Sequence, residues 1–194
     1  MDTVDLQYIL DHSGILRKLN GQVCAKDLLP IHRPANVKAY IVNTHNAKRP
    51  GEHWVAIFFY DNDTAVYFDS YGLPPYHNHI LEFLDKNSKR WTMNTTLLQG
   101  LLSMMCGVYC IYALHYLALG YPLDVLIDHR FNQKLQSADA NDKIVGLWFK
   151  KTYGTLYNEA QSLPKEGQCC QCCMPSQGGK QEALYLFRLY VLLR

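Results

Sequence analysis

The segment from Cys106 to Leu119, with the sequence CGVYCIYALHYLAL, is apolar nearly all the way round a helix. A surface helix carries an apolar stripe and a polar face, whereas a helix without a polar face has to be covered on every side. The segment ends at Gly120-Tyr121-Pro122, and glycine followed by proline is a common helix stop. We therefore predict a buried helix that begins at Cys106, around which the rest of the chain packs.

Two β-rich runs upstream of this helix predict a hairpin. The first run, Trp54–Tyr60, is almost entirely apolar, as in a central strand covered on both faces, and the second is Thr64–Phe68. A tight turn at 61–63 joins them. His53 stands at the entry of the hairpin and Asp69 at its exit. Because the two ends of a hairpin lie side by side, we expect the side chains of His53 and Asp69 to meet.

The remaining apolar periodicity predicts further helices and strands. Helical spacing covers 4–19 (with Gly21 as its stop), 80–84, 123–135 and 141–153. β-rich runs cover 37–44 and 92–98. No internal repeat interrupts this order of elements, so the chain is not a repeat array.

Length and composition favour one globular domain followed by a tail. With 194 residues and 48% hydrophobic content, the chain can bury a sizeable core. We assign the domain to residues 1–160 and a flexible Cys-rich tail, with a short apolar end, to residues 161–194. The formal net charge of +2 makes nucleic acid a weak expectation as a partner.

The chain also carries no sequence signal for export or membrane insertion. No apolar run reaches the roughly 18–20 residues of a transmembrane helix. The start MDTVDLQYIL has no basic segment of the kind that opens a signal peptide. We therefore expect an intracellular, reduced protein in the nucleus or cytoplasm, or in a virion-like particle, and we expect a monomer.

The predicted start of the buried helix combines several groups that thiol chemistry requires. Cys106 would sit in the first helical turn, where unpaired N–H groups and the helix dipole favour a thiolate. His53 could take the thiol proton, and Asp69 could orient the imidazole and stabilise its charged form. Gln99 could donate its amide to a substrate oxyanion together with the backbone N–H of Cys106. Gly107 would let a backbone approach the nucleophile closely.

Each of these residues also has a structural interpretation when it is taken singly. His53 beside Trp54 could be a core histidine, and Asp69 begins an ordinary turn sequence. Cys110 lies inside the apolar helix, where a free cysteine usually belongs to the core. Gln99 alone indicates nothing. The combination of all four types, each at the edge of a different element, favours a catalytic site.

Other reactive residue types have weaker functional signals, and we expect no metal and no cofactor. The His77-x-His79 pair in a proline-bounded loop is most simply a pair of exposed histidines. His115 lies on the far part of the buried helix and should be a satisfied core histidine. The run Cys169–Cys173 does not have standard zinc spacing, although adjacent thiols could hold zinc or copper(I) or carry acyl chains.

At these motifs the chain resembles the adenovirus endopeptidase (adenain) family, and most of all the adenain-like proteases of Polinton/Maverick DNA transposons and related viruses. The similarity covers about residues 5–150 and is more distant to the ubiquitin-like-protein proteases. It is carried by GQVCAKDLLP at Gly21–Pro30, IVNT at 41–44, PGEHWVAIFF at 50–59, YFDSYGLPP at 67–75, LQGLLSMMCGVYC at 98–110 and ND-x-x-V at 141–145. Met105 stands where the ubiquitin-like-protein proteases have an aspartate.

The resemblance implies a role for each matching residue. His53 would be the general base, Asp69 its partner, Cys106 the nucleophile and Gln99 an oxyanion donor. Trp54 would flank the imidazole, with a plain core residue as the alternative. Adenain itself has glutamate at the position of Asp69, whereas the ubiquitin-like-protein proteases have aspartate. The fold implied is α+β, with a mixed central sheet packed against helices and a buried central helix that starts at the nucleophile.

The family resemblance also implies a function. Adenain cleaves viral precursor proteins, often after glycine, and is stimulated by a disulfide-linked peptide and by DNA. The chain is therefore predicted to be a cysteine endopeptidase that acts on polypeptide precursors, with an activating peptide as a potential partner. No cysteine here matches the one that links the peptide in adenain. Two alternatives stay open: an isopeptidase that removes ubiquitin-like tags, and a catalytically silent domain that binds protein.

Overall fold

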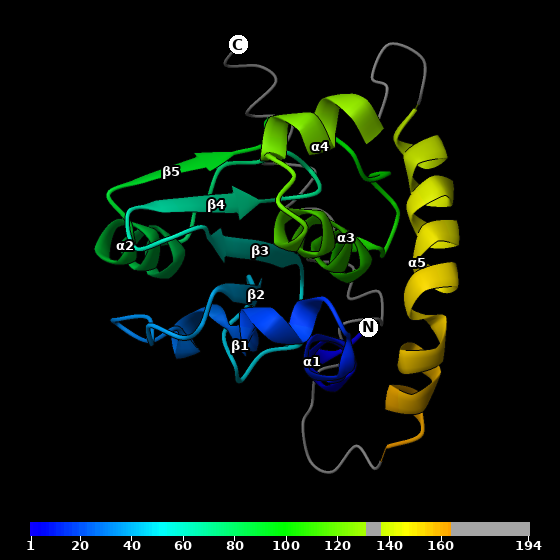
Figure 1. The fold of residues 1–194 in the computed structure, drawn as a ribbon, viewed down its shortest axis with the longest axis horizontal. Helices are drawn as coiled ribbons and strands as arrows, with labels where there is room; N and C mark the ends of the chain where they lie inside the picture. Colours follow the sequence, from blue (N-terminus) through cyan, green and yellow to red (C-terminus); the bar gives the residue numbers. More distant parts are fainter. Residues whose placement is uncertain (131–136, 164–194) are drawn as a thin grey trace.

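A five-stranded sheet forms the centre of the protein in a computed structural model, which describes residues 1–130 and 137–163 (Figure 1). The strands are β1 (Gln22–Ala25), β2 (Ala39–Asn43), β3 (Trp54–Phe59), β4 (Thr64–Phe68) and β5 (Arg90–Met93). The α-helices are α1 (Thr3–His12), α2 (Asn78–Asn87), α3 (Cys106–Ala118), α4 (Leu123–Arg130) and α5 (Ala138–Gln161). Short 3₁₀ turns cover Leu16–Leu19 and Lys26–Leu28.

The sheet is mixed, and its strands lie in the order β1-β2-β3-β4-β5. The three middle strands pair antiparallel, while β1 runs parallel to β2 and β5 runs parallel to β4. Helices cover both faces of this sheet (Figure 1). The predicted α+β class, with a mixed central sheet packed against helices, is therefore confirmed.

The central strand β3 is buried on both faces, as its apolar sequence predicts. Alternate residues serve two cores, because successive side chains of a strand point to opposite faces. The core toward α3 takes Trp54, Ala56 and Phe58. The core toward α2 takes Val55, Ile57 and Phe59.

Helix α3 is the buried helix that the sequence predicts. Every residue from Tyr109 to Leu117 is buried, and the helix packs on β3 and against α4 and α5. It ends just before Gly120, whose φ of 87° lies in the left-handed region that glycine adopts at helix ends. Because α3 packs on β3, its first residue, Cys106, lies beside the start of that strand.

The predicted N-terminal helix over 4–19 is in fact two elements. Helix α1 ends at His12, and Ser13 has an extended backbone with ψ of 132°. The Ser13 hydroxyl then accepts the backbone N–H of Leu16, the first residue of the following 3₁₀ turn, at 3.1 Å. A serine that offers its side chain to the backbone in this way competes with helix continuation.

Three further elements differ from the sequence prediction, namely an edge strand, the strand near residue 92 and the last helix, whereas a fourth element is described only in part. The short edge strand β1 was not predicted, and the run at 92–98 is a strand only as far as Met93. Helix α5 starts at Ala138, capped by Ser137, and continues to Gln161, well beyond the predicted 141–153. Of the predicted helix 123–135, α4 covers the part up to Arg130, and the rest lies outside the described residues.

The domain boundary at residue 160 falls in the last turn of α5, and the predicted Cys-rich tail from residue 164 onward lies outside the described residues. Within the two described ranges, no helix is both long enough and apolar enough to cross a lipid bilayer.

Candidate active site

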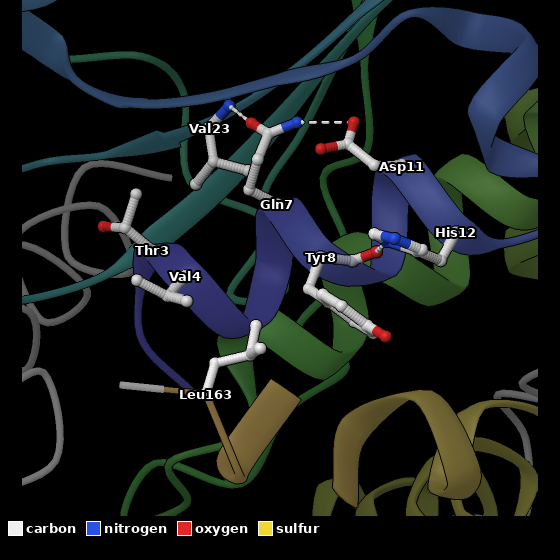
Figure 2. A pocket seen from close by; sticks show the side chains of 8 residues that line it. All are labelled: Thr3, Val4, Gln7, Tyr8, Asp11, His12, Val23 and Leu163. Carbon is white, nitrogen blue, oxygen red and sulfur yellow. Dashed lines mark hydrogen bonds between the residues drawn. The ribbon is translucent and has the colours of Figure 1, made fainter. Parts of the chain in front are cut away.

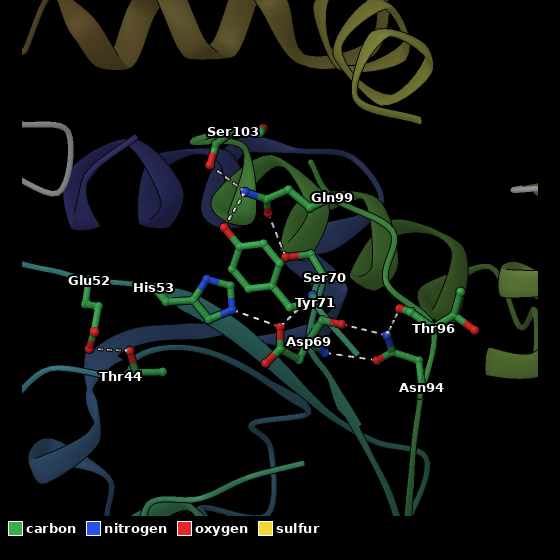
Figure 3. Close-up of polar contacts among 10 residues, drawn as sticks. All are labelled: Thr44, Glu52, His53, Asp69, Ser70, Tyr71, Asn94, Thr96, Gln99 and Ser103. Carbon is green, nitrogen blue, oxygen red and sulfur yellow. Dashed lines mark hydrogen bonds and ion pairs between the residues drawn. The ribbon is translucent and has the colours of Figure 1, made fainter. Parts of the chain in front are cut away.

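The candidate site lies at the end of the sheet where β3 begins and β4 ends (Figure 3). His53 directly precedes β3, and its carbonyl accepts the N–H of Thr44 at 2.9 Å. Asp69 directly follows β4. The imidazole Nε2 of His53 lies 2.9 Å from Oδ1 of Asp69, and both side chains are buried. The antiparallel pairing of the two strands thus brings together two residues that are 16 positions apart.

Asp69 is held by two residues that were not predicted as site residues. Asn94 clamps its backbone: the Asn94 amide donates to the Asp69 carbonyl at 2.6 Å, and the Asn94 oxygen accepts the Asp69 N–H at 3.0 Å. The backbone N–H of Tyr71 donates to Oδ1 of Asp69 at 2.8 Å. Oδ1 therefore accepts from both Tyr71 and His53, whereas Oδ2 is buried without a hydrogen-bond partner among the described residues.

The thiol of Cys106 faces this pair from the first residue of α3. It interacts with the imidazole of His53 and accepts hydrogen bonds from the backbone N–H groups of Trp54 and Gly107. Because Nε2 of His53 is bound to Asp69, the other ring nitrogen, Nδ1, is left for the thiol. The structure therefore brings Cys106, His53 and Asp69 together in one line of contacts.

The surroundings shift the pKa values of the thiol and the imidazole in opposite directions. Burial alone would raise the pKa of Cys106, but the contact with His53 outweighs it and holds this pKa below its ordinary value of 9.0. Burial alone would lower the pKa of His53, but Asp69 and the thiolate raise it to about 10. Both shifts favour a thiolate paired with an imidazolium over a neutral thiol and imidazole.

Gln99 is fully buried and its amide is bound within the protein. Its Nε2 donates to the carbonyl of Ser103 at 2.8 Å and to the hydroxyl of Tyr71 at 3.3 Å. Its Oε1 accepts from the hydroxyl of Ser70 at 2.7 Å (Figure 3). The amide thus lies beside the Tyr71 hydroxyl, and both of its N–H groups have acceptors in this state.

The backbone on both sides of Gln99 is fixed by the start of α5. The Asn141 side chain donates to the carbonyl of Leu98 at 3.1 Å. The carboxylate of Asp142 accepts the N–H of Gly100 at 3.2 Å. These residues belong to the ND-x-x-V motif at 141–145, for which the sequence alone predicts no role. Together they explain how a loop residue such as Gln99 keeps a defined place.

Trp54, Tyr71 and Gly107 surround the thiol and the imidazole. Trp54 is 2% exposed and lies in the core, which agrees with the structural alternative for this residue. The ring that stacks on the imidazole of His53 is Tyr71, with centroids 4.8 Å apart and planes at 26°. A Cβ on Gly107 would lie 3.5 Å from Cδ1 of Trp54 and 3.4 Å from Cδ2 of Leu6, so a side chain here meets the core directly.

Two residues of α3 that could have competed with Cys106 are ordinary core residues. Cys110 is 1% exposed, and burial raises the pKa of its thiol well above the ordinary value. His115 is buried and its Nδ1 lies 2.7 Å from the hydroxyl of Tyr153. Both side chains were predicted from the sequence to belong to the core.

The histidines at 77 and 79 lie in different surroundings. His79 is exposed, and Nδ1 of His77 lies 3.1 Å from Nζ of Lys26. Burial and the neighbouring Lys26 lower the pKa of His77 to about 4, so its ring stays neutral. Among residues 1–130 and 137–163, no three histidine, cysteine or acidic side chains are grouped as a metal site would require. The Cys169–Cys173 run lies outside these ranges.

A cavity of about 370 Å³ lies elsewhere, along α1 (Figure 2). It is lined by Thr3, Val4, Gln7, Tyr8, Asp11, His12, Val23 and Leu163. None of these belongs to the Cys106–His53–Asp69 contacts. Its side chains also bind one another, since Gln7 contacts both Asp11 and the backbone of Val23.

No protein-family model and no curated protein matches this chain. Among solved structures, the selenomethionine crystal structure of the ASFV pS273R protease is similar to part of it, with a TM-score of 0.40 and 16% sequence identity. The alignment covers 58% of this chain and 44% of that protease, so the chain spans less than half of that protein's length.

Proposed function

We propose that this chain is a cysteine-type peptidase in which Cys106 is the nucleophile, His53 the general base and acid, and Asp69 the group that orients the imidazole. The observation that carries the proposal is the contact series from thiol to imidazole to carboxylate, with Nε2 of His53 2.9 Å from Asp69. A nucleophile, a base and an orienting group in contact are what thiol hydrolysis requires.

The geometry supports a two-step reaction. The Cys106 thiolate attacks the carbonyl carbon of the substrate, so that a C–S bond forms and the carbonyl electron pair moves onto oxygen. When the oxyanion collapses, the C–N bond breaks and the His53 imidazolium gives its proton to the leaving amine. Water, deprotonated by the now neutral His53, then attacks the thioester and releases the acid and the thiol. Asp69 stabilises the imidazolium between these steps.

The oxyanion needs donors in the first and second step. The backbone N–H of Cys106 at the start of α3 is one candidate, favoured by the positive end of the helix dipole. The Gln99 amide is the other, and it would have to exchange its contact with Ser103 or Tyr71 for the substrate oxygen. An amide that is already fixed in place would reorganise little when it makes that exchange.

We further propose an endopeptidase that processes protein precursors, with a preference for small residues before the cleaved bond. The motif resemblance to adenain-like proteases supports this substrate class. Peptides with glycine before the cleaved bond should therefore be better substrates than matched peptides with leucine there. Equal turnover of the two series would argue against the preference but not against peptidase activity.

The proposal is tested by profiling new termini in a proteome-derived peptide library, with wild type compared to Cys106→Ala. We expect termini that appear with the wild type and vanish with the variant. If nothing is cleaved although iodoacetamide modifies Cys106 rapidly, a folded ubiquitin-like substrate becomes the better hypothesis. If nothing is cleaved and Cys106 is also inert, the proposed function is wrong and a catalytically silent binding domain becomes the better hypothesis.

A further inference from the structure

We propose that Tyr71 is a catalytic residue of this site, whose phenolic O–H donates a hydrogen bond to the substrate oxyanion while Gln99 holds the hydroxyl in place. The inference rests on the proposed function, because an oxyanion forms only if Cys106 attacks a carbonyl. It assigns a chemical role to a residue that neither the sequence motifs nor the nucleophile–base–carboxylate series requires.

Three contacts fix Tyr71 against the site. Its backbone N–H donates to Oδ1 of Asp69 at 2.8 Å, which ties it to the orienting carboxylate. Its ring stacks on the imidazole of His53, with centroids 4.8 Å apart. Its hydroxyl oxygen accepts from Nε2 of Gln99 at 3.3 Å (Figure 3). The phenol is therefore placed between the base and the predicted oxyanion donor.

The direction of the Gln99 contact leaves the phenolic hydrogen available. Gln99 donates, so the Tyr71 oxygen is an acceptor there and its own hydrogen points elsewhere. In the part of the chain that the structure describes, no hydrogen bond from the Tyr71 hydroxyl to another group is found. A hydroxyl that accepts one hydrogen bond becomes a better donor of another, because such chains polarise each other.

The hydroxyl also lies close enough to the nucleophile to sense its charge. Burial is the main cause that raises the pKa of Tyr71, and the Cys106 thiolate is the next, ahead of Asp69. The phenol therefore stays protonated over the working pH range and can donate without transferring its proton. A neutral donor beside a thiolate is suited to the substrate oxygen, which gains negative charge two bonds from the attacking sulfur.

In this state Tyr71 has a hydrogen to donate to the oxyanion, whereas Gln99 does not. Both N–H groups of Gln99 have acceptors, in Ser103 and Tyr71, so direct donation to substrate costs one of those contacts. The relay from Gln99 through the Tyr71 hydroxyl keeps both and still presents a hydrogen to the oxyanion. Stacking on His53 makes the position of this hydrogen depend on the imidazole, so base and donor move together.

The test compares wild type with Tyr71→Phe, which keeps the ring stack and the backbone N–H and removes only the hydroxyl. We measure kcat and KM on a cleaved peptide, the affinity of a peptide aldehyde that forms a tetrahedral adduct with Cys106, and the rate of Cys106 alkylation by iodoacetamide. Tyr121→Phe removes the same atom from a residue that is 41% exposed and lies outside the site, and it serves as the matched control.

We expect kcat to fall by about 10²–10³, the usual effect of losing one oxyanion donor, and aldehyde binding to weaken by a similar factor. Alkylation should stay within about twofold of wild type, because it forms no oxyanion and needs only the ion pair. Tyr121→Phe should change none of the three. Unchanged kcat and aldehyde affinity in Tyr71→Phe would overturn the inference. A parallel loss of alkylation would also overturn it, because the hydroxyl would then act on the thiolate–imidazolium pair and not on the oxyanion.

Failure of the proposed function gives a different result. If wild type cleaves no peptide in a Cys106-dependent manner, the peptidase proposal fails on its own. The aldehyde adduct of Cys106 then still decides the role of Tyr71, because the adduct carries the same oxygen. Equal adduct stability in wild type and Tyr71→Phe would overturn the inference there as well.

Discussion

Replacing Asp69 by asparagine tests the electrostatic part of the site with little change in shape. Oδ1 of Asp69 accepts from His53 and from the Tyr71 backbone N–H, whereas Oδ2 has no partner among the described residues. We therefore expect the asparagine oxygen to take the Oδ1 position and its NH₂ group to take that of Oδ2. The imidazole then keeps its tautomer, and what is lost is the negative charge beside it.

The size of the effect follows from the separation of the two groups. Two unit charges 2.9 Å apart attract by about 6 kcal/mol at an effective dielectric constant of about 20, which is a ceiling because burial of both charges opposes it. We expect a loss of about 10²–10³ in kcat/KM, or roughly 2.7–4 kcal/mol. A loss of about 10⁴, as an inverted imidazole tautomer would cause, would instead indicate that the amide had turned over.

The pH dependence of Cys106 alkylation reports the same change without a peptide substrate. In wild type the pKa of Cys106 lies below its ordinary value of 9.0, so the thiolate and its alkylation persist at lower pH than for a free thiol. In Asp69→Asn the imidazolium is less stable, and the midpoint of the alkylation profile should move up toward 9.0. Asp85→Asn on α2, at an exposed position away from the site, is the matched control. An unchanged profile together with wild-type turnover would refute the role of the carboxylate.

Three further changes separate catalysis from stability. Gln99→Ala should lower kcat by about 10²–10³ through loss of a donor or of the relay, with Cys106 alkylation retained, as steady-state kinetics and mass spectrometry can show. Gly72→Ala should lower the free energy of unfolding in urea by at least about 2 kcal/mol, because φ is +70° and a Cβ would lie 2.7 Å from backbone atoms. Gly14→Ala, with nothing within 4 Å, should change it by less than about 0.5 kcal/mol. Cys110 should stay unmodified in native protein that is alkylated at Cys106. Peptide mapping would show any alkylated Cys110 and so contradict this prediction.

The parts of the fold that the sequence predicts well are those with strong local signals. Helix α3 has no polar face, and β3 is apolar throughout, so both could be placed from neighbouring residues alone. The edge strand β1 was missed because four residues with mixed burial carry little pattern, and its pairing with β2 is a tertiary contact. The break in the N-terminal helix depends on the Ser13 side chain, which a count of apolar spacing does not register.

The candidate site likewise contains contacts that the sequence predicts and contacts that it does not. The meeting of His53 and Asp69 is predictable because one hairpin joins them, and hairpin ends lie together. Asn94 was hidden inside a β-rich run, where it breaks the strand to bind the Asp69 backbone. Tyr71 sits in a turn sequence that predicts only a turn. The stacking of its ring on the imidazole and the contact of its hydroxyl with Gln99 arise only in the tertiary structure.

The site is assembled from two parts that are fixed by different means. His53 and Asp69 belong to the end of the sheet and are tied there by backbone contacts and by Asn94. Cys106 belongs to α3, and it reaches the sheet part through the imidazole and the backbone N–H of Trp54. The alignment of thiol and imidazole therefore depends on how α3 packs on β3. Because packed cores resist small displacements, this helix–sheet interface sets the thiol–imidazole geometry more firmly than the loops around it can.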